Sequence, residues 1–479
     1  MADGDKAVRA PRGPARGHGG RDLTSGPIAR TLLAFALPTL GSNILQSLNG
    51  SINAIWVGRF LGENALAATS NANLVLFLML AAIFGFGLAS TILVGQNMGR
   101  RDLEGVRRAM GTAVGLFSIA SVAISVVGYL ASPAILRALA TPPGAMPLAE
   151  AYLRVIFIGL PASFLMIIVT MAMRGTGDST TPFVIMILNV LLDSGLNPVF
   201  ILGLGGAPRM GIAGSATATA LAGYISLVAL VVVIYARDLT VRLRGRELRW
   251  LVPDPALLRV IVGKGVPMGL QMFVVSGASL ALIGFVNRAG VDVTAGYGVT
   301  LQLWTYIQMP ALAIGAATSA MAAQNVGAGL WERVDAVTRW GILVNLVITA
   351  VLIVAVTLVE RPVLALFLGE ASPALPIARH INAIVAWSFT LFGVTMVIFG
   401  TVRATGAVVA PLIILAIAMF PVRFGVLFAL KPWIGTDALW WSMPAGSAFS
   451  MLAAIAYYRA GGWRTLHMRT TSPREVASV

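Results

Sequence analysis

Asp193 is the residue with the clearest capacity for chemistry in this chain. It falls near the middle of an apolar run over residues 181–203, whereas the rest of the 19 Asp and Glu residues are expected in tails and loops. A carboxylate in lipid is costly and is seldom retained without a use. Because desolvation disfavours the charged form, this group is a candidate for taking up and releasing a proton. The alternative is a carboxylate that hydrogen bonds between helices only for packing.

Two polar stripes accompany this acid. In the run that holds it, Asn189, Asp193 and Asn197 are spaced by four residues and therefore share one helix face. The first apolar run carries a second stripe at spacings of three to four residues: Asn43, Gln46, Asn49 and Asn53. Two such stripes predict a wet pocket. The small-residue segment 211–219 is typical of close helix packing, and its Thr217 and Thr219 are candidates to add hydroxyls to the pocket. The alternative for each amide is interhelical hydrogen bonding, worth about 1 kcal/mol.

The elements that must position these residues are membrane-spanning helices. With 57% hydrophobic and 11% charged residues, the chain is too apolar for a water-soluble fold. Its apolar runs reach the roughly 20 residues that a spanning helix needs, and they lack the weak alternation of barrel strands. The sequence therefore predicts an all-α polytopic membrane protein with twelve spans: 30–57, 66–94, 109–131, 148–172, 181–203, 211–236, 259–286, 294–322, 338–359, 376–401, 407–430 and 438–459.

The chain contains an internal duplication. Similar segments recur at an offset near 229 residues: Pro38 and Pro267, Val57–Arg59 and Val286–Arg288, Gly95–Gly99 and Ala323–Gly327, Arg174–Gly177 and Arg403–Gly406. Each copy holds six spans, and an even number brings both copies into the membrane from the same side. This predicts two parallel, pseudosymmetric six-helix lobes with a central cleft between them.

The predicted organisation has five parts: a disordered cytoplasmic tail (1–27), an N-lobe (28–236), a basic cytoplasmic linker (237–258), a C-lobe (259–460) and a cytoplasmic tail (461–479). The net charge of +15 gathers in the tails and in every second loop, as the positive-inside rule requires if both termini are cytoplasmic. We expect these basic segments to contact anionic lipid headgroups, and we expect no nucleic-acid partner. Arg423, the one basic residue placed inside a span, is expected to reach the outer face near Lys431.

Composition also excludes several classes of function. The chain has no Cys, which excludes disulfides and thiolate metal sites. Its three histidines are far apart in sequence, and it shows neither a phosphate-binding loop nor a metal-ligand cluster. We therefore predict no enzyme activity, no cofactor and no bound metal.

The residues singled out so far match a known family. The chain resembles the multidrug and toxic compound extrusion family of secondary transporters over residues 28–460. The motifs that carry the resemblance are Pro38, Trp56–Gly62 with Ala65–Ala68, Gly95–Gly99, Arg174–Asp178 with Thr181 and Pro182, and Leu196–Pro198 followed by 211–219. The resemblance implies a bacterial, V-shaped protein of twelve helices. It also implies export of organic compounds, often cationic and aromatic, in exchange for H+ or Na+.

The resemblance further implies where the coupling cation acts. Many bacterial relatives place an Asp on the first helix, an Asn and an Asp on the fifth, and a Thr on the sixth. The matching positions here are Asn53, Asp193, Asn197 and Thr219, so one carboxylate stands where the family usually has two. The C-lobe positions at which other relatives carry acids hold Val275 and Phe392. A single buried acid suits a proton better than Na+, because protonation removes the charge.

The predicted function is secondary active efflux of small organic molecules, cationic or amphipathic, in antiport with H+ rather than Na+. We predict proton coupling at Asp193, and cation or substrate binding at Asn53, Asn189, Asn197, Thr219, Gln46 and Asn49. The alternative is a flippase for lipid-linked oligosaccharide or another amphipathic metabolite. It is disfavoured because such a cleft needs Arg and Lys, and the spans are almost free of them. We expect a monomer in the cell membrane, which is the inner membrane where a bacterium has two.

Overall fold

The chain folds into a bundle of long α-helices. The computed structural model describes residues 20–466 and 468, without the side chains of residues 63, 64, 66, 67 and 71. The remaining parts of the predicted tails, 1–19, 467 and 469–479, lie outside the described residues. No strand occurs in the described part of the chain. The predicted all-α class is confirmed, as expected where lipid cannot hydrogen bond to exposed backbone.

The described helices divide between the two lobes. Six helices build the N-lobe: α1 (Ile28–Leu61), α2 (Glu63–Gly99), α3 (Leu103–Ala138), α4 (Met146–Gly175), α5 (Thr180–Leu202) and α6 (Ile212–Ala236). Eight α-helices build the described C-lobe: α7 (Pro255–Asn287), α8 (Val291–Gly327), α9 (Trp331–Leu368), α10 (Ala374–Val385), α11 (Ser388–Arg403), α12 (Val409–Ile417), α13 (Arg423–Ile434) and α14 (Asp437–Ala460).

Two C-lobe spans are interrupted, so eight helices make six crossings. The axes of α10 and α11 differ by 45° across a short break. α12 continues into α13 through a π-helical turn at Ala418–Val422, where Pro421 removes a backbone donor from the ladder. By length and composition, nine of the described helices could cross a membrane, or ten if the bent pair is one span. α8 and α14 are not among these ten, and adding them gives the twelve spans that the sequence predicts.

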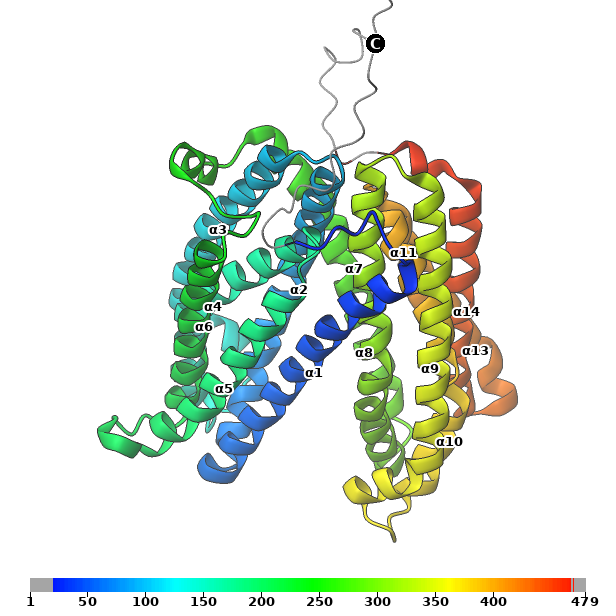
Figure 1. Cartoon of the computed structure of the whole chain (residues 1–479). Helices are drawn as coiled ribbons and strands as arrows, with labels where there is room; N and C mark the ends of the chain where they lie inside the picture. Colours follow the sequence, from blue (N-terminus) through cyan, green and yellow to red (C-terminus); the bar gives the residue numbers. More distant parts are fainter. Residues whose placement is uncertain (1–19, 467, 469–479) are drawn as a thin grey trace, which may run out of the picture.

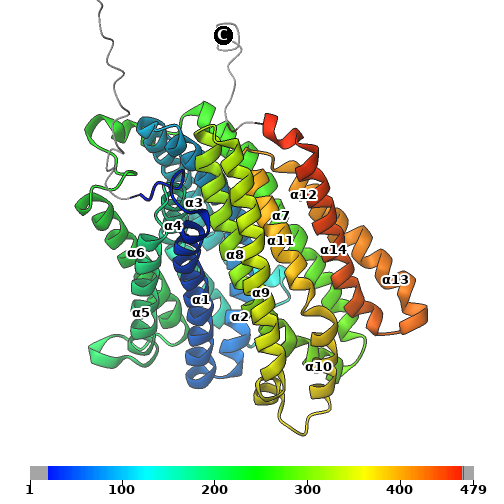
Figure 2. The same cartoon turned by 45° about the vertical axis from the view of Figure 1, so that its right-hand side comes forward.

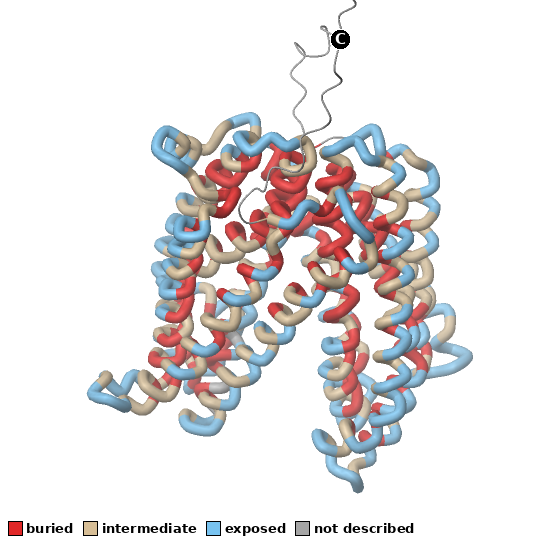
Figure 3. The backbone as a smooth tube through the Cα atoms, in the orientation of Figure 1, coloured by how far each residue is buried: buried red, intermediate tan, exposed pale blue. Residues whose placement is uncertain are grey.

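The two lobes meet at one end of the molecule and diverge toward the other, which gives a V (Figure 1). Both described ends of the chain lie where the lobes meet, which we call the closed end. α2 packs against α7 and α8. α1 packs beside α8, as Figure 2 shows from a second direction. Buried positions concentrate in this region, whereas the outer faces of the helices are largely exposed (Figure 3). In a membrane protein those exposed apolar faces contact lipid.

A reciprocal pair of contacts joins the lobes at the closed end. Gln96 of α2 donates its side-chain N–H to the carbonyl of Ala404, just after α11, at 2.7 Å. Its counterpart Gln324 of α8 donates to the carbonyl of Gly175, at the end of α4, at 3.0 Å. Gly99 and Gly327 let α2 and α8 approach, because a Cβ on either would collide with the backbone carbonyl of the opposite glutamine. The duplicated Gly95–Gly99 and Ala323–Gly327 motifs therefore form the seam between the lobes.

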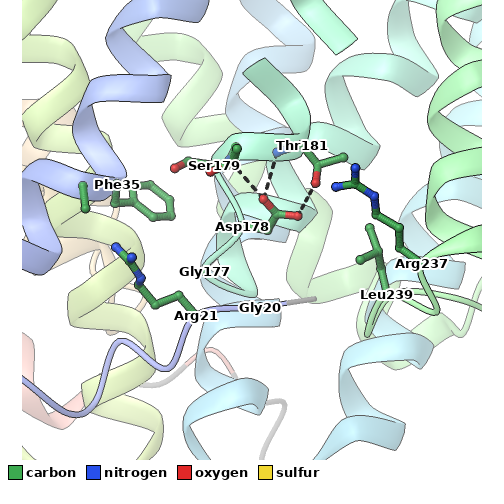
Figure 4. Close-up of a pocket in the computed structure, with 11 residues that line it drawn as sticks. Gly20, Arg21, Phe35, Gly177, Asp178, Ser179, Thr181, Arg237 and Leu239 are labelled. Carbon is green, nitrogen blue, oxygen red and sulfur yellow. Dashed lines mark hydrogen bonds between the residues drawn. The ribbon is translucent and has the colours of Figure 1, made fainter. Parts of the chain in front are cut away.

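The segment 20–27, which falls in the predicted N-terminal tail, crosses this seam. Leu23 is fully buried; its N–H donates to Gln324 Oε1 at 3.0 Å and its carbonyl accepts from Asn325 Nδ2 at 3.1 Å. On the N-lobe side, Gly20 and Arg21 lie beside the turn that starts α5 (Figure 4). In that turn Asp178 caps the helix by accepting from the N–H of Thr181 at 2.9 Å. This part of the chain thus touches both lobes.

The linker between the lobes is also packed rather than free. Glu247 pairs with Arg107 of α3 at 2.9 Å, and Asp254 pairs with Arg108. Within the linker Asp238 pairs with Arg242 at 3.1 Å. Some of its positive charge is therefore neutralised by the protein, and contact of the rest with lipid headgroups stays a prediction.

Candidate functional site

Asp193 lies inside the N-lobe and not on its lipid-facing surface. Its exposed fraction is 1%. It forms no ion pair with any Lys, Arg or His of the described residues. The carboxylate is thus held without a counter-ion, which is the arrangement in which a change of protonation breaks no salt bridge.

Neutral donors from three helices surround the carboxylate. Oδ1 accepts from Thr219 Oγ1 of α6 at 2.9 Å and from Asn197 Nδ2 of α5 at 3.2 Å. Oδ2 accepts from Asn53 Nδ2 of α1 at 3.3 Å. Ser215 donates to Asn53 Oδ1 at 3.1 Å, which orients the amide. The structure therefore brings together the four positions that the family resemblance assigned to the coupling cluster.

Local sequence explains how these side chains meet. Asp193 and Asn197 are one turn apart on α5, so both point to the same side. α6 approaches that side closely because Gly214 has no side chain; a Cβ there would collide with the carbonyl of Phe200. Ser215 and Thr219, again one turn apart, then face α1 and α5. Small residues at the start of α6 thus position its hydroxyls.

The other predicted site residues fall in different places. Asn49 lies close enough to the Asp193 carboxylate to interact with it. Asn189 has a buried side-chain oxygen with no hydrogen-bond partner among the described residues, and it does not bond to the cluster. Gln46 lines a separate cavity, together with Asn43. The polar stripe of α1 therefore serves two sites, one at each half of the helix.

Two members of the cluster escaped the sequence analysis. Ser215 is fully buried and orients Asn53. The sequence analysis missed it because it stands among small residues typical of helix packing, although its position one turn before Thr219 was an available signal. Tyr152 of α4 is also buried and lies close enough to interact electrostatically with Asp193. A single Tyr in a long apolar run gives no periodic signal, so only the packing of α4 reveals it.

A cavity of about 370 Å³ lies between the lobes near the closed end. Its walls come from α1, α2 and α4 of the N-lobe and from α7, α8 and α11 of the C-lobe. Its large apolar lining residues are Phe84, Leu88, Met171, Met272, Met309, Leu312 and Met396. Its size falls at the small end of the range for ligand pockets. Asp193 does not line it, so the acid and the cavity are distinct sites.

Two arginines line this cavity, which corrects the expectation of a cleft almost free of Arg and Lys. Arg174 lies in the last turn of α4 and Arg403 in the last turn of α11. The predicted spans ended at 172 and 401 because charge interrupts the hydropathy, but the helices continue to Gly175 and Arg403. No Asp or Glu of the described residues lines the cavity.

A second buried acid corrects the expectation that Asp193 would be alone. α9 runs to Leu368, past the predicted end of its span at 359, so Glu360 lies within the helix and is 7% exposed. Its carboxylate pairs with Arg379 at 3.0 Å and accepts from Asn382 Nδ2 at 2.8 Å. This acid therefore has the counter-ion that Asp193 lacks.

The predicted outward reach of Arg423 is wrong. Its side chain is 7% exposed and packs inside the C-lobe, where Nη1 lies 3.9 Å from the sulfur of Met419. The Arg423 side chain packs against neighbouring helices and therefore does not extend to the membrane surface. Among the described residues, no group of three or more acidic or histidine side chains could hold a metal ion.

Comparison with known proteins places these sites in context. The family model described as MatE matches the chain twice, over residues 38–199 and 267–428, once in each lobe. The chain belongs to the MatE family. This MatE chain is 36% identical to the probable multidrug resistance protein YoeA of Bacillus subtilis over 432 residues, which cover 90% of this chain and 93% of that protein. It is also 24% identical to a FAD transporter of Shewanella oneidensis over 345 residues, or 72% and 75% of the two chains.

A solved structure shows the same fold. The outward-facing conformation of a multidrug resistance MATE family transporter has a TM-score of 0.84 to this MatE chain at 22% identity, and the match covers 94% of this chain and 98% of that one. The twelve-helix, two-lobed architecture is therefore shared. The protein is a multi-pass membrane transporter of the multidrug efflux type and not an enzyme.

Proposed function

We propose that this transporter exports amphipathic organic molecules in exchange for protons, and that Asp193 carries the proton. The observation that supports the proposal is a carboxylate that is 1% exposed and is held only by neutral donors. Burial disfavours the charged form of the carboxylate, so the neutral, protonated form of Asp193 can be populated. Losing the charge there breaks hydrogen bonds but no ion pair.

The orientation of the donors favours H+ over Na+. Asn53 and Asn197 each turn an amide N–H toward the carboxylate, and Thr219 turns its hydroxyl. Hard cations take several oxygen ligands, whereas N–H and O–H groups recognise an anion. Na+ coupling would require both amides to rotate.

The proposed cycle alternates access across the cell membrane. With both termini in the cytoplasm, the closed end faces inward and the diverging ends of the lobes face outward. Protonation of Asp193 from outside removes its charge and weakens its hold on Asn53 and Thr219, so α1 is released from α5 and α6. Release of the proton inward restores the bonds. Exchange requires that the substrate bind these two states with different affinities.

A gradient experiment tests this proposal. Purified protein in liposomes is given an H+ gradient or a Na+ gradient separately, and flux of a fluorescent amphipathic compound is recorded. We expect the H+ gradient alone to drive flux, and Asp193→Asn to abolish that drive. Glu360→Gln is the matched control, since it neutralises a buried acid in the other lobe. Flux driven by Na+ alone, or full proton drive in Asp193→Asn, would contradict the proposal.

A second candidate function is transfer of a phosphorylated amphipathic molecule, either lipid-linked oligosaccharide or another metabolite. Arg174 and Arg403 in the cavity favour it, and one relative is named as a FAD transporter. Flux of a lipid-linked sugar compared with flux of a water-soluble compound separates the candidates.

A further inference from the structure

The two arginines of the central cavity occupy equivalent positions in the two repeats. Arg174 and Arg403 stand in the duplicated motifs that end α4 and α11, and both side chains line the cavity. One guanidinium therefore comes from each lobe. A ligand that touched both would contact both halves of the molecule at once.

Neither arginine has an acidic partner among the described residues. The Nε atom of each is buried and hydrogen bonds to no described residue. The recorded partner of Arg174 is the sulfur of Met171, at 4.0 Å from Nη1. Arg403 donates to the neutral amide of Gln271 and lies over the ring of Phe399, 5.5 Å from its centroid. The last turns of α4 and α11 offer partial negative charge, which offsets only part of the cost of burying each cation.

The rest of the cavity suits an apolar, flat body. Methionines from both lobes and Phe84 line it. Met side chains adapt to ligands of different shape, and an aromatic ring offers a stacking surface. Because no Asp or Glu of the described residues lines the cavity, nothing in it would neutralise a cationic ligand.

We propose that this cavity selects organic anions, and that Arg174 and Arg403 bind the carboxylate, sulfonate or phosphate of a ligand whose apolar body lies against Phe84 and the methionines. Guanidinium groups form paired, charge-assisted hydrogen bonds to such groups. The inference rests on the proposed export function and names its substrate class. It replaces the expectation of cationic substrates, which came from the family resemblance.

Two xanthene dyes of opposite charge test the proposal. Binding of carboxyfluorescein, an anion, and rhodamine 123, a cation, to the purified full chain is measured by fluorescence anisotropy, without any gradient. We expect the anion to bind at least about tenfold tighter. Arg174→Gln and Arg403→Gln should each lower the affinity for the anionic dye by about tenfold. The affinity for the cationic dye should stay unchanged or rise. Equal or tighter binding of the cation to the wild type would overturn the proposal.

Control variants separate ligand binding from a structural role. Arginines that only cap their helices would, when replaced, weaken both dyes together, and that result also overturns the proposal. Arg423→Gln is the matched control, because it removes a buried arginine outside this cavity and should leave both dyes unchanged. Should a Gln variant fail to fold, Arg174→Lys and Arg403→Lys keep the positive charge but lose the paired N–H donors of the guanidinium. The Lys variants should still bind the anionic dye more tightly than the cationic dye. Their loss of affinity for the anion should be smaller than that of the Gln variants.

Competition identifies the source of the anion. Farnesyl pyrophosphate and inorganic pyrophosphate are each tested for displacement of carboxyfluorescein. Stronger displacement by the prenyl compound supports a lipid-linked ligand, and displacement by neither assigns the site to soluble aromatic anions. Asp193→Asn should keep the dye preference even if it loses proton drive. Absence of proton-driven flux in the wild type would therefore sink the proposed function while the dye preference stands. Proton-driven flux without a preference for the anionic dye would sink only this inference.

Discussion

Among the described residues, each lobe buries one carboxylate, and the two lobes hold it in opposite ways. Asp193 in the N-lobe accepts only from neutral donors, at 2.9 to 3.3 Å. Glu360 in the C-lobe is nearly as buried but pairs with the guanidinium of Arg379. A neighbouring cation strongly favours the charged form, whereas hydrogen bonds from neutral donors favour it less and burial opposes it. If the proposed function holds, the absence of a counter-ion, rather than burial alone, distinguishes the coupling carboxylate from the structural one.

The strongest test converts the first site into the second. Asn53→Lys brings an ammonium to Asp193 in place of the amide that now lies at 3.3 Å. We expect proton-driven export to fall to the level of protein-free liposomes, because the paired carboxylate stays ionised. Asn53→Gln is the control for side-chain length and should retain part of the flux. Unchanged flux in the Lys variant would show that a free carboxylate is not required.

A subtler change removes one neutral donor. Thr219→Val keeps the shape of the side chain and removes the hydroxyl that bonds Asp193 at 2.9 Å. A hydrogen bond to a charged group is worth about 1.5 kcal/mol or more, so we expect proton-driven flux to fall by at least about tenfold. Thr217→Val is the matched control, since that hydroxyl bonds the Ala213 carbonyl of its own helix. An equal loss in both variants would indicate damage to α6 rather than to the cluster.

Neutralising the paired acid should have a small effect on transport. Glu360→Gln keeps a hydrogen-bond acceptor for Asn382 and loses the ion pair with Arg379. We expect flux within about twofold of wild type, and a loss of about 1 kcal/mol of stability because the pair is partly solvated. Flux assays and melting curves in detergent measure the two effects. A loss of proton drive comparable to that of Asp193→Asn would assign coupling to both lobes.

The smallest effect is expected at the other member of that pair. The Arg379 side chain is 51% exposed, so solvent already screens its charge. Arg379→Gln should therefore lower stability by less than about 1 kcal/mol and leave flux unchanged. The double variant Arg379→Gln with Glu360→Gln checks this expectation. If flux in Arg379→Gln were lost on adding Glu360→Gln, then removal of the counter-ion would be sufficient to create a coupling site.

The spans, the duplication and the core of the cluster could be predicted from the sequence. Lipid excludes unpaired backbone, so long apolar runs have one structural outcome. The i, i+4 spacing of Asp193 and Asn197 placed them together, and the family resemblance supplied Asn53 and Thr219. These positions depend on short-range geometry or on motifs, both of which a sequence records.

Features set by helix ends and by packing could not be predicted. Hydropathy falls at the first charged residue, but backbone hydrogen bonding continues through the interface, which is why Glu360, Arg174 and Arg403 were placed outside the helices. The break between α10 and α11 falls at Ala386 and Trp387, neither of which is a helix breaker. The burial of Arg423 follows from how α13 packs, and no local pattern encodes it.

The crossed glutamines of the seam limit how the molecule can change state. Gln96 and Gln324 each hold the last turn of a helix in the opposite repeat, and a rotation about the axis that relates the repeats displaces both by the same amount. Neither bond can therefore be lost alone without distorting the symmetry of the pair. The two lobes should therefore separate at the closed end in a single cooperative event. A partly open form that leaks ions should be rare.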